Sequence, residues 1–141
     1  MRWKTVLVDD ERRSLETMQW LLEECCPEVE ITGMYDSPLA ALAALRQSPP
    51  DLLFLDIAMP GLNGFDLLRQ LLPLSFSIIF VTAYNGPTVR ALKNTGLPFL
   101  LKPVDEVELT GMISRLHLQP AITDHHLEIL QGFFQTGHEG G

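Results

Sequence analysis

Short apolar runs alternate along this chain with stretches in which apolar residues recur at helical spacing. The runs are too continuous for half-exposed strands, and they indicate strands buried on both faces of a parallel sheet. This alternation predicts a doubly wound α/β fold with helices on both faces, and the flavodoxin-like strand order 2-1-3-4-5 suits 141 residues. The predicted strands are 4–8, 28–35, 51–55, 77–81 and 97–101, and the predicted helices are 14–25, 38–46, 64–71, 87–94 and 106–117.

Proline, glycine and serine mark several element boundaries. Ser37 is a good N-cap, and Pro38 follows it at the first helical position, where a missing N–H costs nothing. Pro87 repeats this start signal, and Gly96 is placed to end the short helix that follows. Pro98 would interrupt a central strand, so the fifth strand is expected at an edge of the sheet.

Composition excludes several classes of protein. The formal net charge of -8 argues against a nucleic-acid surface within these residues, which would need clustered basic side chains. No apolar run approaches the length of a membrane helix, and the N-terminus lacks a signal-peptide pattern. The adjacent Cys25 and Cys26 provide no disulfide framework. A cytoplasmic protein with reduced thiols is therefore expected.

The C-terminal segment looks different from the rest of the chain. Pro120 is expected to end the compact domain, which gives a domain over 1–119 and a tail over 120–141. In the tail, apolar residues recur at helical spacing, and the last six residues are expected to be flexible. This tail helix either packs on its own domain or leads into a second one. The apolar positions are Leu127, Leu130, Phe133 and Phe134.

Polar side chains stand at the ends of four predicted strands. Asp9 and Asp10 follow the first strand, Asp56 the third, Thr82 the fourth and Lys102 the fifth. Parallel strands bring these ends to one edge of the sheet, where open α/β folds bind ligands. Crowded carboxylates raise one another's pKa unless a cation lies between them, and oxygen ligands alone favour Mg²⁺ or Mn²⁺ over zinc.

Each of these residues also has a simpler explanation. Asp9 and Asp10 could form a turn that caps the next helix, and Lys102 could be a solvated surface residue. Thr82 could be an ordinary strand threonine, because threonine is common in strands. The combination of independent acids from two strands shifts the balance toward a metal site.

Five motifs occur together in a recognisable order. They are Val8-Asp-Asp-Glu11, Leu55-Asp-Ile-Ala-Met-Pro-Gly61, Asn63-Gly64, Val81-Thr-Ala83 and Leu101-Lys-Pro-Val104. With these motifs, the sequence over about residues 3–117 resembles the receiver domain of a two-component response regulator. The residues around Lys102 and Asp105 are also similar to the type that often precedes a LytTR DNA-binding domain.

The resemblance implies a role for each residue of the acidic pocket. Asp56 matches the phosphoacceptor, which takes a phosphoryl group from a phosphohistidine on a sensor histidine kinase. Asp10 would bind Mg²⁺ directly and Asp9 would assist it. Ala58 would offer the metal only its backbone carbonyl.

The resemblance also implies how phosphorylation is sensed. Thr82 would donate its hydroxyl to the phosphoryl group, Ala83 its backbone N–H, and Lys102 would pair with another phosphoryl oxygen. The peptide bond to Pro103 is expected to be cis. Phe99 stands where many members of the family have a switch tyrosine, so the signal would pass from Thr82 to Phe99.

Output and lifetime follow from the same resemblance. The face formed by the fourth helix, fifth strand and fifth helix is the family's usual output and dimer surface, so a homodimer through it is expected. Ala58 and Tyr84 occupy positions that influence autodephosphorylation. Because Ala58 has no polar side chain to orient water, the phosphorylated form is expected to be long-lived.

Other functions remain open. A pseudo-receiver that binds proteins without being phosphorylated is the main alternative, and the intact acidic pocket argues against it. A phosphate-ester hydrolase would need a second acid two residues after Asp56, where the chain has Ala58. A dinucleotide-binding fold is excluded because no Gly-x-Gly-x-x-Gly follows the first strand. The expected role is therefore a signalling switch that catalyses only its own phosphorylation and slow dephosphorylation.

Overall fold

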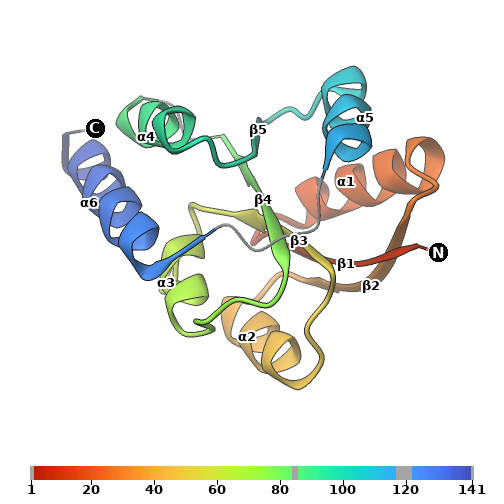
Figure 1. Ribbon diagram of the computed structural model, residues 1–141, viewed down its shortest axis with the longest axis horizontal. Coiled ribbons are helices and arrows are strands. Elements are labelled where there is room, and N and C mark those ends of the chain that lie inside the picture. Colours follow the sequence, from red (N-terminus) through yellow and green to blue (C-terminus); the bar gives the residue numbers. More distant parts are fainter. Residues whose placement is uncertain (1, 84–85, 117–121, 141) are drawn as a thin grey trace.

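Five parallel strands form one twisted sheet in the order β2-β1-β3-β4-β5 (Figure 1), which confirms the predicted flavodoxin-like topology. The computed structural model describes residues 2–83, 86–116 and 122–140, with side chains described as far as Gly132. The strands lie within two residues of their predicted limits. They are β1 (Trp3–Val8), β2 (Val29–Tyr35), β3 (Leu52–Asp56), β4 (Ser77–Thr82) and β5 (Phe99–Leu101).

Helices cover both faces of the sheet. Among the helices of the described residues, two pack on one face and four on the other, and each face of the sheet has its own hydrophobic cluster. The predicted helix end at His117 lies outside the described residues. The first face carries α1 (Arg12–Cys25) and α5 (Glu106–Arg115); the second carries α2 (Pro38–Gln47), α3 (Gly64–Arg69), α4 (Pro87–Thr95) and α6 (Asp124–Gly140).

The boundary signals act as the sequence predicts. The Ser37 side chain accepts a hydrogen bond from the Ala40 N–H at 3.3 Å, and α2 begins directly after it. Gly96 ends α4 with a φ of 74°, a left-handed conformation that other residues adopt only with strain. Pro98 directly precedes β5, which is an edge strand.

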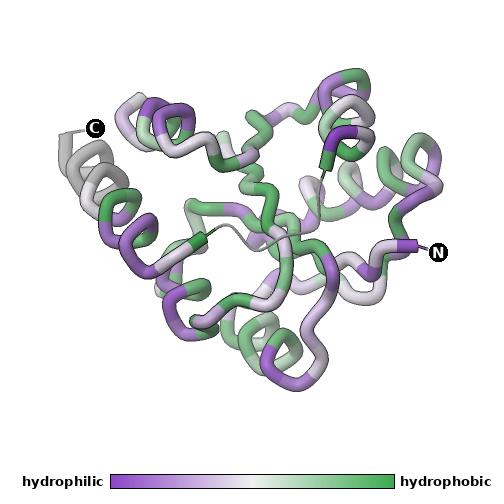
Figure 2. Tube along the Cα trace, viewed as in Figure 1, coloured by the Kyte–Doolittle hydropathy of each residue, from purple (hydrophilic) through white to green (hydrophobic). Residues whose placement is uncertain are grey.

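Strands β3 and β4 are buried along their whole length. Every residue of β3 is buried, and its apolar side chains alternate between the two hydrophobic clusters. Leu53 and Leu55 face α2 and α3, whereas Leu52 and Phe54 face α1. This two-sided burial explains why the strands lack a polar alternation. Figure 2 shows the same concentration of hydrophobic residues along the middle of the sheet.

The C-terminal helix α6 packs against α3 and α4. The Leu127 and Leu130 side chains are fully buried, so the helix rests on the domain that precedes it. Its backbone stays helical to Gly140, through the segment that the sequence predicts to be flexible. The boundary expected at 119/120 lies outside the described residues, as do the side chains of Phe133 and Phe134. Within the described part of the chain, no helix is long and apolar enough to cross a membrane.

Candidate functional site

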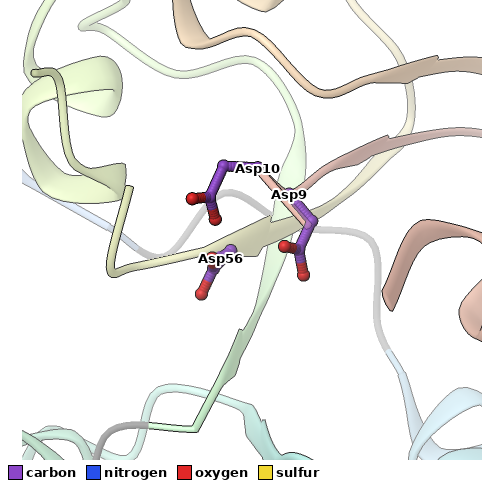
Figure 3. A group of neighbouring side chains, drawn as sticks. All are labelled: Asp9, Asp10 and Asp56. Carbon is purple, nitrogen blue, oxygen red and sulfur yellow. The ribbon is translucent and has the colours of Figure 1, made fainter. Parts of the chain in front are cut away.

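Three aspartates converge at the carboxyl ends of β1 and β3 (Figure 3). Asp9 and Asp10 follow β1, and Asp56 is the last residue of β3. Each contributes a carboxylate oxygen, and these oxygens all lie within 4.8 Å of one another. Asp9 and Asp56 are buried, whereas Asp10 is exposed. The parallel pairing of β1 with β3 therefore places the acids together, as the strand-end pattern indicates.

Lys102 reaches into this acidic cluster from the end of β5. Its Nζ atom lies 2.8 Å from Asp9 Oδ2, 3.0 Å from Glu11 Oε1 and 3.7 Å from Asp56 Oδ2. The side chain is only 13% exposed, so Lys102 is not a solvated surface residue. The peptide bond between Lys102 and Pro103 is cis. Glu11 belongs to the first matching motif and directly follows Asp9 and Asp10, but no role was predicted for it.

Asp9 uses its two oxygens for different tasks. Oδ1 accepts a hydrogen bond from the Glu11 N–H at 2.9 Å, which forms the turn into α1. Oδ2 pairs with Lys102 on the other side. The capping turn that could have explained Asp9 by itself is thus present, and it orients the carboxylate toward the cluster.

Burial dominates the electrostatics of Asp56. It raises the pKa of this carboxyl to about 8, the negative charge of Asp9 adds to the effect, and Lys102 offsets part of it. For Lys102, burial alone lowers the pKa, but the hydrogen bond to Asp9 and the charge of Asp56 raise it overall. Burial and the neighbouring Asp9 therefore disfavour the ionised form of Asp56 as long as no cation lies among the aspartates. A divalent cation would favour the ionised, nucleophilic form.

The remaining predicted residues lie at the end of β4, in β5 and in the loop after β3. Thr82 ends β4 and is fully buried, and Ala83 follows it at the exposed edge. Ala58 is exposed in the loop after β3. Phe99 is half-buried in β5 and packs against the hydrophobic cluster beneath α3 and α4. Tyr84 lies outside the described residues.

The loop after Asp56 returns tightly to α3. The Asn63 side chain accepts a hydrogen bond from the Asp66 N–H at 2.9 Å, and the Asp66 carboxylate accepts one from the Asn63 N–H at 3.3 Å. This capping box fixes the first turn of α3. Gly64 lies against β3, because a Cβ atom there would be 2.6 Å from the Asp56 carbonyl oxygen. The sequence includes Asn63 and Gly64 in a motif but does not reveal these contacts.

Residues 5–114 match the family model described as the response regulator receiver domain. The chain belongs to the response regulator receiver family. A response regulatory protein of Vibrio cholerae is 36% identical to the receiver, over 85% of this chain and 51% of that protein. The transcriptional regulatory protein BtsR of Escherichia coli is 32% identical, over 86% and 51%. The receiver thus spans about half the length of these curated relatives.

Solved structures support the same fold. The isolated receiver domain of RcsB from Salmonella enterica superposes with a TM-score of 0.72 at 22% identity, covering 92% of this chain and 99% of that domain. That domain was solved in the presence of the phosphomimetic BeF3-. At this level of identity the likeness shows the fold of the receiver and not its residue roles.

Proposed function

We propose that this receiver accepts a phosphoryl group on Asp56 from the phosphohistidine of a sensor histidine kinase and thereby switches a signalling output. The observation that carries the proposal is the burial of Asp56 beside two further aspartates and Lys102. A buried carboxylate that meets both cation-binding acids and a fixed ammonium suits the transfer of a highly charged group. The receiver is a signalling switch and not an enzyme with a separate substrate.

In the proposed transfer, an Asp56 carboxylate oxygen attacks phosphorus in line with the leaving group. A new P–O bond forms as the P–N bond of phosphohistidine breaks, and the electron pair stays on the imidazole nitrogen, which takes a proton from solvent. When Mg²⁺ or Mn²⁺ is bound, it supplies positive charge to the carboxylates and the phosphoryl oxygens. Asp10 and Asp56 would hold it directly, with help from Asp9 and the Ala58 carbonyl.

The other side of the phosphoryl group would meet protein donors. Lys102 would leave its pairs with Asp9 and Glu11 for a phosphoryl oxygen. Thr82 would offer its hydroxyl and Ala83 its backbone N–H. The movement of Thr82 would then reach Phe99, which packs against the cluster beneath α4. Such switching is a population shift that new phosphoryl contacts favour.

Incubation with acetyl phosphate tests the proposal. In the presence of Mg²⁺ the intact protein should gain the mass of one phosphoryl group. An excess of EDTA should suppress the gain, because no cation then offsets the repulsion between the carboxylates and the phosphoryl oxygens. The measurement is intact-protein mass spectrometry of matched samples. If the wild-type protein gains no mass with Mg²⁺, the result favours a phosphorylation-independent scaffold.

The lifetime of the phosphorylated form provides a second prediction. Ala58 is exposed at the mouth of the site and offers no polar group to orient an attacking water. We expect Ala58→Asn to shorten the half-life by roughly ten-fold, which corresponds to ~1.4 kcal/mol in the barrier to hydrolysis. The half-life is measured by following loss of the phosphoryl mass after removal of acetyl phosphate. A wild-type half-life of only a few seconds would contradict the prediction.

The proposed partners follow from the exposed surface. A homodimer through α4, β5 and α5 is supported by Leu101 and Val107, which are 40% and 75% exposed on that face. The relatives are twice as long and one is named a transcriptional regulatory protein, so we infer that an output domain acts together with this receiver. The proposed location is the cytoplasm, where a kinase could reach the site.

A further inference from the structure

Helix α6 fills the space between α3 and α4. Figure 1 shows it at one side of the molecule, next to both helices. Leu127 and Leu130 are fully buried and belong to the same hydrophobic cluster as Ala91 and Leu92 of α4. The tail therefore completes the core on this face, and a groove for an amphipathic helix would open if α6 left it.

Polar contacts fix the position of α6 on α3. The Arg69 guanidinium donates from Nη1 to Asp124 Oδ1 and from Nε to Gln131 Oε1, both at 2.8 Å. The Gln131 amide donates in turn to Asp66 Oδ1. The other oxygen of Asp66 accepts the Asn63 N–H in the capping box of α3. A single carboxylate thus links α6 to the turn that begins α3.

The two helices that α6 contacts are the next helices along the chain after the two strands that end at Asp56 and Thr82. The first residue of α3, Gly64, lies against the Asp56 carbonyl. Helix α4 begins at Pro87, five residues after Thr82 along the chain. If Thr82 moved toward a phosphoryl group on Asp56 and α4 followed it, α4 would shift relative to α3. Helix α6 packs on both helices, so its docking would oppose such a shift.

We propose that α6 is a displaceable inhibitory helix whose docking in the groove between α3 and α4 opposes phosphorylation of Asp56. The proposal rests on the proposed function of Asp56. Because linkage is reciprocal, phosphorylation must weaken the docking of α6 by the same factor by which docking disfavours the phosphorylated form. The occupant of the groove is the α6 of the same chain, and its release exposes the buried side of α4.

The first test measures the initial rate of phosphorylation by acetyl phosphate with Mg²⁺ in full-length variants. Leu130→Ala removes a buried contact of α6 and should raise the rate by about five-fold or more, because the rate follows the population of the phosphorylation-competent state. Ile129→Ala is the matched control, because Ile129 is 38% exposed on the same helix. Leu45→Ala controls for general loss of core packing, since Leu45 is buried in α2.

The outcomes separate clearly. An increase for Leu130→Ala with both controls near wild type supports the proposal. A wild-type rate for Leu130→Ala, or an equal increase for Leu45→Ala, overturns it. If Leu130→Ala does not fold, Gln131→Ala replaces it and should raise the phosphorylation rate for the same reason, whereas a wild-type rate overturns the proposal. This variant removes the hydrogen bonds to Arg69 and Asp66 without creating a cavity in the core.

Hydrogen exchange gives a direct measure of docking. With Mg²⁺ and beryllofluoride, a phosphoryl mimic, the backbone amides of residues 127–131 should exchange several-fold faster than with Mg²⁺ alone. Unchanged or slower exchange overturns the proposal. These results differ from a failure of the proposed function, in which the wild-type protein takes up no phosphoryl group at all.

Discussion

Replacing Asp56 by asparagine is expected to abolish phosphoryl uptake and to stabilise the metal-free fold. The amide is not a nucleophile, so intact-mass measurements with acetyl phosphate and Mg²⁺ should show no gain. It also carries no charge to bury. In the wild type, burial and the charge of Asp9 raise the Asp56 pKa to about 8, which shows that the fold disfavours the carboxylate.

The pH dependence of this stabilisation has a defined sign. Below the unfolded pKa of about 4, Asp56 is protonated in both states and the variant should gain little. As the pH rises toward 8, the unfolded state loses the proton that the folded state keeps, so the wild type loses stability relative to the variant. Each unit by which the folded pKa exceeds the unfolded pKa corresponds to ~1.4 kcal/mol of lost wild-type stability at high pH. The variant regains only part of this energy, because its buried amide must also leave water. We expect a gain on the order of 2 kcal/mol at neutral pH.

Urea unfolding in EDTA measures the gain, and a matched exposed aspartate controls for the change of residue type. Asp105→Asn should leave stability almost unchanged, because Asp105 is exposed and asparagine is an equally good N-cap for α5. Added Mg²⁺ should stabilise the wild type and not Asp56→Asn. Phosphoryl uptake by Asp56→Asn would show that another residue is the acceptor.

The fold could be predicted because its signals are local. Strands buried on both faces leave continuous apolar runs, and residues such as Pro38 and Gly96 mark where helices begin and end. The strand ends predict the acidic site for a related reason. Once the sheet is parallel, Asp9, Asp56 and Lys102 must emerge at one edge.

Contacts between elements distant in the sequence could not be predicted in the same way. The helical spacing of Leu127 and Leu130 predicts that one face of the tail helix is buried. It does not indicate which surface of the domain covers that face. The pairing of Glu11 with Lys102 joins residues 91 positions apart, and it depends on the turn that Asp9 makes into α1. Glu11 belongs to the motif Val8-Asp-Asp-Glu11, but nothing in that motif indicates that its carboxylate pairs with Lys102.

Replacing Gly64 by alanine is expected to destabilise the protein by about 2 to 3 kcal/mol, the upper range for overpacking a rigid site. The φ of Gly64 is not positive, so the glycine is needed for space and not for a special conformation. The new Cβ would lie 2.6 Å from the Asp56 carbonyl oxygen and 3.1 Å from the Ile57 Cα. Both are backbone atoms, so α3 or the loop after Asp56 must shift.

That shift should also weaken metal binding and phosphorylation. The loop that moves begins after Asp56 and carries the Ala58 carbonyl that is proposed to bind the metal. We expect Gly64→Ala to need more Mg²⁺ for half-maximal phosphorylation than the wild type, under conditions where both remain folded. Gly111→Ala in α5 is the matched control. Its Cβ would meet only the flexible end of Arg115, at 3.2 Å, and alanine favours the helix by up to about 1 kcal/mol. Equal stabilities for the two variants in urea unfolding would mean that α3 does not rest on β3 at Gly64.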